Sequence, residues 1–353
     1  MKRHQHKARR SHTARQPKNG RAPNGHNPTY AAIDLGTNNC RLLIAEPNGS
    51  AFKVIDSFSR IVRLGEGLTV SGKLTDDAIE RTTDALKICA QKIHRHNVSF
   101  TRSVATEACR QASNSEKFLE HIESHTGIKL ETIEPEEEAH LTLAGCLPLI
   151  DRNTNFTLAF DIGGGSTEIM WIANDNQGQP VLHDTISIQL GVVSLAEKFG
   201  HDTITPENYQ WIIDTITRNL DEFDQRYDMS RHIAEENVQM LGTSGTVTTL
   251  AGIHLDLPRY DRSIVDGLTI DFESIHAIVS RLVEMDYDTR CAHPCIRQER
   301  ADLMIMGCVI LDAVCRRWPV SRLRVADRGI REGILLAMMN ANQRPPMPAA
   351  AAS

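Results

Sequence analysis

The sequence predicts an α/β fold in which two related domains face each other across a cleft. One observation is the length, since 353 residues make about two ordinary domains. Another is the alternation along the chain of segments typical of strands with segments typical of helices. The third is a repeated pattern, in which an apolar strand runs into Asp-x-Gly and polar side chains. It occurs at Asp34 and again at Asp161.

The two ends of the chain differ from the rest in composition. Residues 1–29 contain eight Lys or Arg, no Asp or Glu, and almost no apolar residues. We expect this segment to be disordered, either as a solvated tail or as an electrostatic arm for a polyanion. It has no apolar stretch behind its charges, so it does not fit a secretory signal peptide. The low-complexity tail at residues 343–353 is also expected to be disordered.

Bulk composition argues against several classes of partner. The net charge is −6 although the first segment is basic, so the remaining chain is acidic, which disfavours specific nucleic-acid binding. No uncharged apolar run is long enough to predict a membrane span. Most of the eight cysteines lie in apolar runs, which is typical of reduced cysteines in a cytoplasmic protein.

The first predicted domain covers residues 30–150. It opens with two strands, "TYAAIDLG" and "NCRLLIAE", joined by a glycine turn, and "FKVIDSFSRIVRL" continues as a strand. Thr75 is a good N-cap for a helix with acids in its first turn and bases in its last. The stretch "VSFTRSVATEA" is expected to run from a strand into a helix that ends at Gly127. After the strand "IKLETI", Pro135 begins the helix "EPEEEAHLTLAGCLPLI".

The second predicted domain covers residues 151–329 and starts after the polar break "DRNTN". It again opens with strand, turn and strand, in "FTLAFDIGGGSTEIMWIAN", and it contains further helices. The apolar strand "VQML" leads into a glycine-rich stretch from Gly242 to Gly252 and the start of a helix. The last helix, at about 330–342, is expected to pack back on the first domain.

The two glycine turns predict a phosphate site. Glycine lets backbone N–H groups approach a ligand, and consecutive N–H groups form an anion-binding concavity. The carboxylates of Asp34 and Asp161 would repel a phosphate there unless a cation intervenes, which implies Mg²⁺ or Mn²⁺. The expected phosphate-binding residues are Gly36, Thr37, Asn38, Gly163, Gly164, Gly165, Ser166 and Thr167.

Other interpretations of the turns remain open. No Gly-Lys-Ser/Thr follows, and a strand comes next, which disfavours a P-loop and a dinucleotide site. Each turn could instead be a tight hairpin without a ligand, although two copies with matching carboxylates make this less favoured. In the third glycine stretch, Ser244, Gly245 and Thr246 could hold a phosphate at a helix N-terminus or could simply cap that helix.

Four motifs occur in order: "AIDLGTNN", "FDIGGGSTE", "GTSGT" and "GIREG". With them the chain resembles the exopolyphosphatase/guanosine pentaphosphate phosphatase family, part of the actin-like, sugar-kinase-like ATPase superfamily. The resemblance spans about residues 30–339 and implies two ribonuclease-H-like (actin-like ATPase) domains flanking an interdomain active-site cleft. It also implies a homodimer. Asn39 departs from the family, which usually has serine there, but it keeps a hydrogen-bond donor.

The resemblance implies a reaction and roles for three further residues. The reaction is Mg²⁺-dependent hydrolysis of the terminal phosphoanhydride of inorganic polyphosphate, or of pppGpp to ppGpp. Glu138 matches the family's general base, although acids at a helix start are also favoured by the helix dipole alone. Arg110 matches an arginine that grips phosphate, or it forms a surface ion pair with Glu107 or Glu116. Arg331 is either a phosphate ligand or a structural partner of Glu332.

Three other functions remain possible at this stage. One is a phosphotransferase like the sugar kinases, and another is an alarmone sensor that binds pppGpp without hydrolysing it. A third is nucleic-acid binding through the basic arm at residues 1–29. The motifs do not decide between polyphosphate and pppGpp, because both present the same terminal group.

Overall fold

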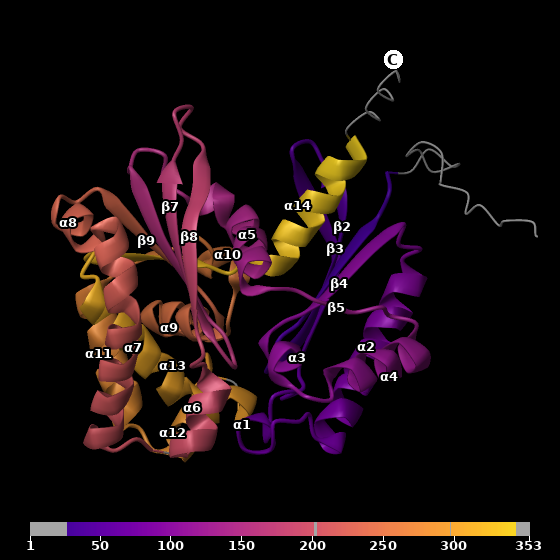
Figure 1. Cartoon of the computed structure of the whole chain (residues 1–353), viewed down its shortest axis with the longest axis horizontal. Coiled ribbons are helices and arrows are strands. Elements are labelled where there is room, and N and C mark those ends of the chain that lie inside the picture. Colours follow the sequence, from indigo (N-terminus) through magenta and orange to yellow (C-terminus); the bar gives the residue numbers. More distant parts are fainter. Residues whose placement is uncertain (1–26, 201–202, 297, 344–353) are drawn as a thin grey trace, which may run out of the picture.

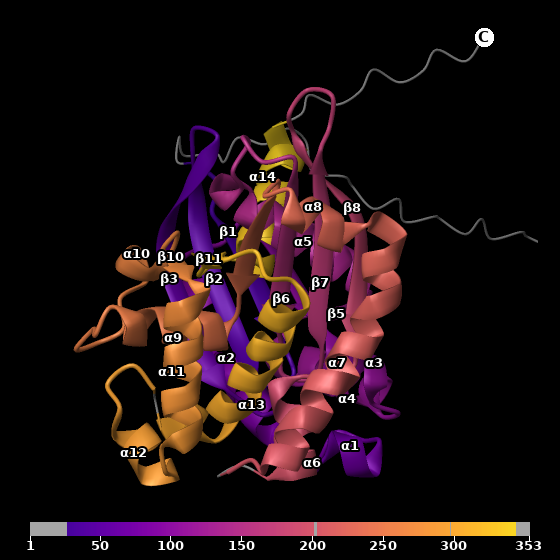
Figure 2. The same cartoon turned by 90° about the vertical axis from the view of Figure 1, so that its left-hand side faces the viewer.

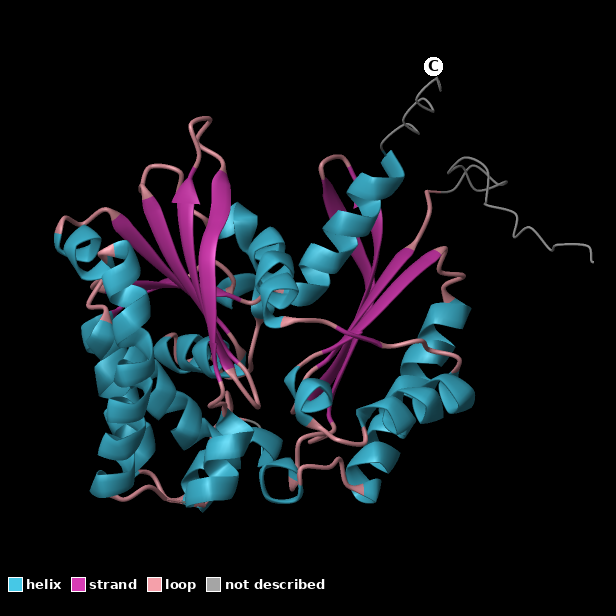
Figure 3. Ribbon diagram, in the orientation of Figure 1, coloured by secondary structure: helices cyan, strands magenta, loops and turns pink. Residues whose placement is uncertain are grey.

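The structure is a computed structural model that describes residues 27–200, 203–296 and 298–343. It contains two β-sheets with helices between and outside them (Figures 1 and 3). The predicted tail from residue 344, and the basic arm apart from residues 27–29, lie outside the described residues.

The first sheet has the strand order β3-β2-β1-β4-β5. Strand β1 lies at its centre, antiparallel to β2 and parallel to β4. The strands are β1 (Tyr30–Leu35), β2 (Asn39–Asn48), β3 (Ala51–Ile61), β4 (Phe100–Ala105) and β5 (Glu131–Thr132).

Successive residues of β1 point to opposite faces of the first sheet, as the period of a strand requires. Ala31 and Ile33 pack on the outer face against α2 (Asp76–Arg95) and α4 (Ser115–Thr126). The hydroxyl of Thr75 accepts a hydrogen bond from the Ala78 N–H at the start of α2, and Gly127 ends α4 in the left-handed conformation. A short helix, α1 (Leu68–Ser71), precedes α2.

One expected helix is divided in two. The stretch after β4 was predicted to continue into a single helix, but it forms α3 (Glu107–Gln111) and α4 with a break at residues 112–114. The Asn114 side chain explains the break, because it binds both backbone groups of Leu74. It accepts from the Leu74 N–H at 2.9 Å and donates to the Leu74 carbonyl at 3.0 Å. These bonds tie residue 114 to the segment just before α2, 40 residues earlier in the chain, where it precedes the first residue of α4.

The second sheet has the strand order β10-β11-β9-β6-β7-β8. Its strands are β6 (Phe156–Ile162), β7 (Thr167–Asn174), β8 (Pro180–Ile188), β9 (Val238–Thr243), β10 (Thr269–Asp271) and β11 (Arg322–Ala326). The outer face carries the largest apolar core, and α7, α11 and α13 lie side by side there (Figure 2). The helices of this half are α6 (Val192–Phe199), α7 (Pro206–Tyr227), α8 (Met229–Ala234), α9 (Gly245–His254), α10 (Arg262–Val265), α11 (Phe272–Glu284), α12 (Tyr287–Ala292) and α13 (Gln298–Arg317).

The two sheets share one topology. In each, three antiparallel strands are followed by two strands parallel to the first, so that β6, β7, β8, β9 and β11 correspond to β1 to β5. Strand β10 is an added antiparallel edge on the second sheet. The internal duplication seen in the openings of the two halves therefore extends through both sheets. Strands β10 and β11 were not identified from the sequence.

Two helices lie between the sheets, α5 (Pro135–Cys146) and α14 (Ile330–Gln343) (Figure 1). A short 3₁₀ helix at Leu147–Leu149 follows α5. Ile334 and Leu335 of α14 pack against the first sheet, although α14 follows the second sheet in sequence. In the same way, Leu143 of α5 packs against the second sheet. Each helix therefore connects one half of the chain to the other.

The crossing of α5 and α14 depends on glycine. A Cβ placed on Gly333 would lie 1.9 Å from the carbonyl oxygen of Leu141, and one on Gly145 would lie 2.1 Å from that of Gly329. These are backbone atoms that no side-chain rotation can move. The two backbones can approach this closely only because neither glycine has a side chain.

No helix within the described ranges is both long and apolar enough to cross a membrane.

Candidate functional site

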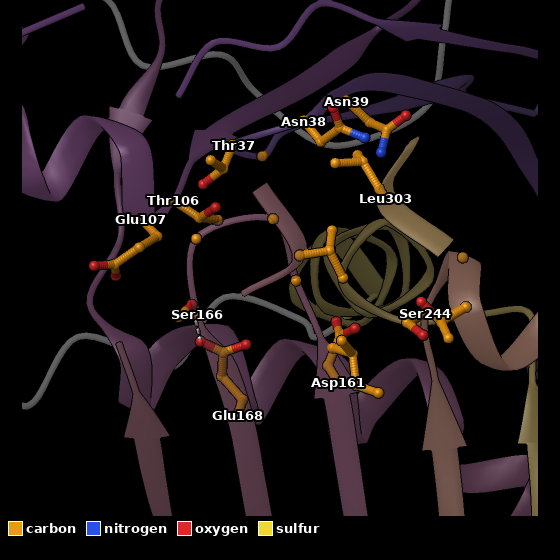
Figure 4. Close-up of a pocket in the computed structure, with 18 of the residues that line it drawn as sticks. Thr37, Asn38, Asn39, Thr106, Glu107, Asp161, Ser166, Glu168, Ser244 and Leu303 are labelled. Atoms are coloured by element: carbon orange, nitrogen blue, oxygen red, sulfur yellow. Dashed lines mark hydrogen bonds between the residues drawn. The ribbon is translucent and has the colours of Figure 1, made fainter. Parts of the chain in front are cut away.

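The glycine loops of the two sheets meet around one cavity of about 120 Å³. It lies where β1 and β6 end, and both predicted aspartates, Asp34 and Asp161, line it. Figure 4 shows side chains from both halves of the chain directed at this space. We call it the glycine-loop cavity, after Gly36, Gly163, Gly164 and Gly165 in its wall.

The first loop, between β1 and β2, is held by its own backbone. The Gly36 N–H donates to the Asn39 carbonyl at 2.9 Å, and the Asn38 carbonyl accepts from Val62 at 2.9 Å. Thr37 and Asn38 are buried at the cavity. The side-chain oxygens of Asn38 and Asn39 have no hydrogen-bond partner among the described residues. Buried polar atoms without partners are unusual, and here they suggest a site for a ligand.

The second loop, between β6 and β7, touches the first. A Cβ on Gly164 would lie 2.9 Å from the Thr37 Cβ and 3.1 Å from the Asn38 nitrogen. On its other side, the Gly164 carbonyl accepts from the Val193 N–H at 2.7 Å, at the start of α6. The loop is therefore clamped between the two halves of the chain, and only glycine fits at residue 164.

Five carboxyl groups line this cavity: Asp34, Glu107, Glu138, Asp161 and Glu168. Burial and then the charge of Glu168 raise the pKa of Glu138 to about 8. Burial and then the charge of Glu138 raise the pKa of Asp161 to about 7, and burial and Asp161 raise that of Glu168 to about 7. Burial also raises the pKa of Asp34. Such a cluster is neutralised either by protons or by a cation.

Glu138 is positioned by an arginine. Arg110 of α3 donates to Oε2 of Glu138 at 2.8 Å, to the Ile133 carbonyl at 2.7 Å and to Glu107 at 2.8 Å. Arg110 is not among the residues that line the cavity, whereas Glu107 and Glu138 are. The ion pair with Glu107, the alternative to a phosphate contact, is thus present, but it is buried rather than on the surface.

The other predicted phosphate ligands lie in different places. Ser166, Ser244, Gly245 and Thr246 line the cavity, and the Ser244 hydroxyl also caps α9 by accepting from the Val247 N–H at 3.2 Å. Thr167 does not line it, because its hydroxyl donates to the Leu190 carbonyl at 2.8 Å. Arg331 lines an adjoining cavity instead.

Four charged residues that line the cavity were not predicted from the sequence: Arg41, Glu107, Glu168 and Arg300. Glu168 belongs to the motif "FDIGGGSTE" and accepts hydrogen bonds from the hydroxyls of Ser166 at 2.5 Å and Ser187 at 3.1 Å. Arg41 lies directly opposite Asp34 in the β1–β2 pairing. The register of the β1–β2 hairpin could have predicted the position of Arg41. Glu107 is brought to the cavity by packing, and no motif indicated it.

Contacts between the two halves flank the cavity. Arg63, after β3, pairs with Asp302 of α13 at 2.7 Å. The Gly67 N–H donates to Glu197 of α6 at 2.6 Å. Figure 1 shows the corresponding approach of α1 and α6. We call these two contacts the bridge.

The donor set suits a hard cation shared with a substrate. In the described part of the chain, no group of three or more His, Cys, Asp or Glu is placed to hold a metal ion by itself. Mg²⁺ is usually bound by one or two carboxylates together with water and substrate phosphate oxygens, so it needs no such group. Asp34 and Asp161, with the amide oxygens of Asn38 and Asn39, fit this kind of site.

Comparison with known proteins gives a consistent result. A model of the Ppx/GppA phosphatase family matches residues 43–342. Exopolyphosphatase 2 of Mycobacterium tuberculosis is 29% identical over 87% of this chain and 98% of that protein. The guanosine-5'-triphosphate,3'-diphosphate pyrophosphatase of Photobacterium profundum is 28% identical over 89% of this chain and 60% of that protein.

Solved structures agree with the fold. The crystal structure of the Aquifex aeolicus member of the Ppx/GppA family has a TM-score of 0.73 and 26% identity, over 90% of this chain and 99% of that one. An exopolyphosphatase-like protein has a TM-score of 0.80 and 28% identity, over 89% of this chain and 99% of that one.

Proposed function

The chain belongs to the Ppx/GppA phosphatase family, and we propose that it is an exopolyphosphatase that releases orthophosphate from the end of inorganic polyphosphate. The observation that carries this proposal is the meeting of two glycine loops and five carboxyl groups around one cavity, with Glu138 in its wall. The loops supply N–H groups for phosphate oxygens, and the carboxyl groups supply a base and cation ligands.

The proposed cofactor is Mg²⁺, or Mn²⁺, held by Asp161 and Asp34. When bound, it would offset carboxylate charge and polarise phosphate oxygens. The N–H groups of Gly164 and Gly165 are proposed to stabilise charge on the phosphoryl group during transfer. The same role was predicted for Gly36 and Gly163, but their N–H groups donate to the carbonyls of Asn39 and Ser166 at 2.9 Å, so these two glycines shape the loops instead.

Glu138 is the proposed general base. A pKa raised to about 8 makes its carboxylate a better proton acceptor than an ordinary glutamate. Arg110 donates to Oε2 of Glu138 at 2.8 Å and holds the side chain in place. In the proposed reaction, the water oxygen forms a bond to the terminal phosphorus as its proton passes to Glu138. The bond from that phosphorus to the bridging oxygen breaks, and the shortened chain keeps the electron pair.

We also propose pppGpp as a second substrate, converted to ppGpp. It presents the same terminal phosphoanhydride, and a relative is named for a guanosine-5'-triphosphate,3'-diphosphate pyrophosphatase activity. A homodimer and a cytoplasmic location remain predictions. Sedimentation velocity measures the first.

Phosphate release from the purified protein with Mg²⁺ tests the proposal. Short polyphosphate, long polyphosphate and pppGpp are compared with ATP plus a sugar, which would reveal a phosphotransferase. Glu138→Gln is expected to lower turnover by about 10²- to 10⁴-fold, the usual contribution of a general base, while polyphosphate still binds. Binding without release in the unmodified protein would indicate a sensor. Full turnover in Glu138→Gln would remove this residue from the mechanism.

A further inference from the structure

The proposed base and the loop that would hold the terminal phosphate belong to different halves of the chain. Glu138 lies on α5, whereas Gly164 and Gly165 lie between β6 and β7. A general base acts only within hydrogen-bond reach of its proton, and a displacement on the order of 1 Å can lower the rate by about 10²-fold. Contacts between the halves must therefore fix the distance from the base to a phosphate held by the loop.

Glu107 is a residue at which the two halves touch beside the base. A Cβ on Gly165 would lie 3.1 Å from Cγ of Glu107, so the loop of the second half packs against this side chain. Oε2 of Glu107 accepts from Nε of Arg110 at 2.8 Å, and Arg110 donates to Glu138 at 2.8 Å. Glu107 therefore connects the loop of the second half to the base through one arginine.

The other carboxylate oxygen of Glu107 is held by Gln111, at the end of α3. The Nε2 group of Gln111 donates to Oε1 of Glu107 at 2.6 Å and to Oε1 of Gln189 at 2.7 Å. A glutamine amide carries two N–H donors, so one side chain can make both bonds. Gln111 belongs to the first half of the chain and Gln189 to the second. The Gln111 amide therefore ties Glu107 to the second half.

Gln189 is in turn fixed to the second glycine loop. It lies in the segment between β8 and α6, and two backbone bonds fasten this segment to the loop. The N–H groups of Val192 and Val193 donate to the carbonyls of Gly163 and Gly164, at 3.0 Å and 2.7 Å. A shift of the glycine loop relative to the first half would therefore move Gln189 as well.

A purely local role for Gln111 is the alternative. Its bond to Glu107 spans four residues of one helix, and pairs at this spacing stabilise helices by themselves. The bond to Gln189 has no such local purpose, because it spans 78 residues of sequence and joins the two halves. This second bond favours a role in placing the halves relative to each other.

We propose that Gln111 and Gln189 are positioning residues that align the general base with the phosphate loop. This inference rests on the proposed function. The connection runs from Gln189 through Gln111, Glu107 and Arg110 to Glu138, and we call it the glutamine relay. Neither glutamine lines the glycine-loop cavity, so neither is expected to touch the substrate. The relay is expected to act on the chemical step, because a displaced base leaves the phosphate-binding groups intact.

Steady-state phosphate release from polyphosphate at saturating Mg²⁺ tests the relay. Gln189→Leu removes one acceptor and should lower kcat by about twofold to tenfold, the usual net effect of one hydrogen bond. Gln111→Leu removes both bonds, one of them to a carboxylate, and should lower kcat by about tenfold to a hundredfold. KM should change by less than about twofold in both variants. Gln189→Glu should retain most of the kcat, because glutamate still offers Gln111 an acceptor.

A double variant separates positioning of the base from other effects on turnover. Glu138→Gln has no base to align, so adding Gln189→Leu should lower its remaining turnover by less than about twofold. An equal loss with and without Glu138 would overturn the inference, since the relay would then act elsewhere. Gln210→Leu is the matched control and should leave turnover unchanged. The Gln210 amide donates to Asp214 within α7 at 2.7 Å, outside the cavity.

The outcomes distinguish this inference from the proposed function. Unchanged kcat in Gln111→Leu and Gln189→Leu would overturn the inference, and phosphate release by the unmodified protein would leave the proposed function standing. A raised KM with unchanged kcat would also overturn it. Both side chains are exposed, so both variants should fold, and melting temperatures check this. If Gln111→Leu does not fold, Gln189→Leu decides. If the unmodified protein releases no phosphate, the proposed function fails and the inference fails with it.

Discussion

Substituting Gly333 by alanine tests the crossing of α5 and α14 directly. Two effects act in opposite directions. Alanine is a better helix former than glycine and would stabilise an isolated helix by about 1 kcal/mol. In this structure, however, the new Cβ would lie 1.9 Å from the Leu141 carbonyl oxygen. A carbon normally approaches such an oxygen no closer than about 3.3 Å, so the helices must separate by roughly 1.4 Å.

The separation has a cost in stability and a cost in activity. Overpacking of this kind costs about 1–3 kcal/mol, and with a Tm change of about 2–4 °C per kcal/mol we expect the Tm to fall by roughly 2–12 °C. Glu138 lies one turn before Leu141 on α5, so the base is displaced with the helix. A displacement on the order of 1 Å can lower turnover by about 10²-fold.

Differential scanning calorimetry and phosphate release measure the two effects. Asn340→Ala is the matched control, because Asn340 is exposed on the same helix. It offers the gain in helix propensity without the clash, and it should raise the Tm slightly and leave turnover unchanged. If Gly333→Ala were as stable and as active as Asn340→Ala, the close crossing of the two helices would be wrong.

Three further predictions concern charge. Asp161→Asn should raise the Mg²⁺ concentration needed for half-maximal activity by at least about tenfold, and an unchanged Mg²⁺ titration would reassign the ligand. In the folded state the pKa of Asp161 is raised to about 7 and that of Glu138 to about 8. In protein kept in EDTA, these groups therefore stabilise the folded state fully below their ordinary pKa near 4, and this stabilisation is lost as the pH rises through the raised values. The Tm should therefore fall from pH 6 to pH 9, and saturating Mg²⁺ should flatten this dependence. A flat profile in EDTA would contradict the burial of these groups. A hydrogen bond from Lys92 lowers the pKa of Asp56 to about 2, so its stabilisation is present above the ordinary pKa of about 3.9 and is lost toward pH 2. Asp56→Asn should lower the free energy of unfolding by about 1 kcal/mol at pH 7 in urea titrations, and this difference should vanish near pH 2.

The sequence was sufficient to predict the plan of the fold because local patterns determine it. Two hairpins with Asp-x-Gly turns predicted two related halves, and the structure has two sheets of matching topology with Asp34 and Asp161 at one cavity. Glycine, capping residues and period-two apolar patterns act within a few residues, so they are visible in a single chain.

Contacts between distant segments could not be predicted in the same way. The role of Arg110 depends on α3 and α5 meeting, which places its guanidinium on Glu107 and Glu138 behind the cavity wall. The cavity that adjoins the glycine-loop cavity combines residues from β2, α9, α13 and α14, and no local pattern predicts such a set. Arg41 is the exception, because the register of one hairpin places it opposite Asp34.

The bridge formed by Arg63 with Asp302 and by Gly67 with Glu197 has a consequence for polymers. The two halves of the chain cannot move apart on this side without breaking both contacts. A phosphate polymer that needed the halves to open would have to break them first, whereas one that entered the glycine-loop cavity by its end would leave them in place.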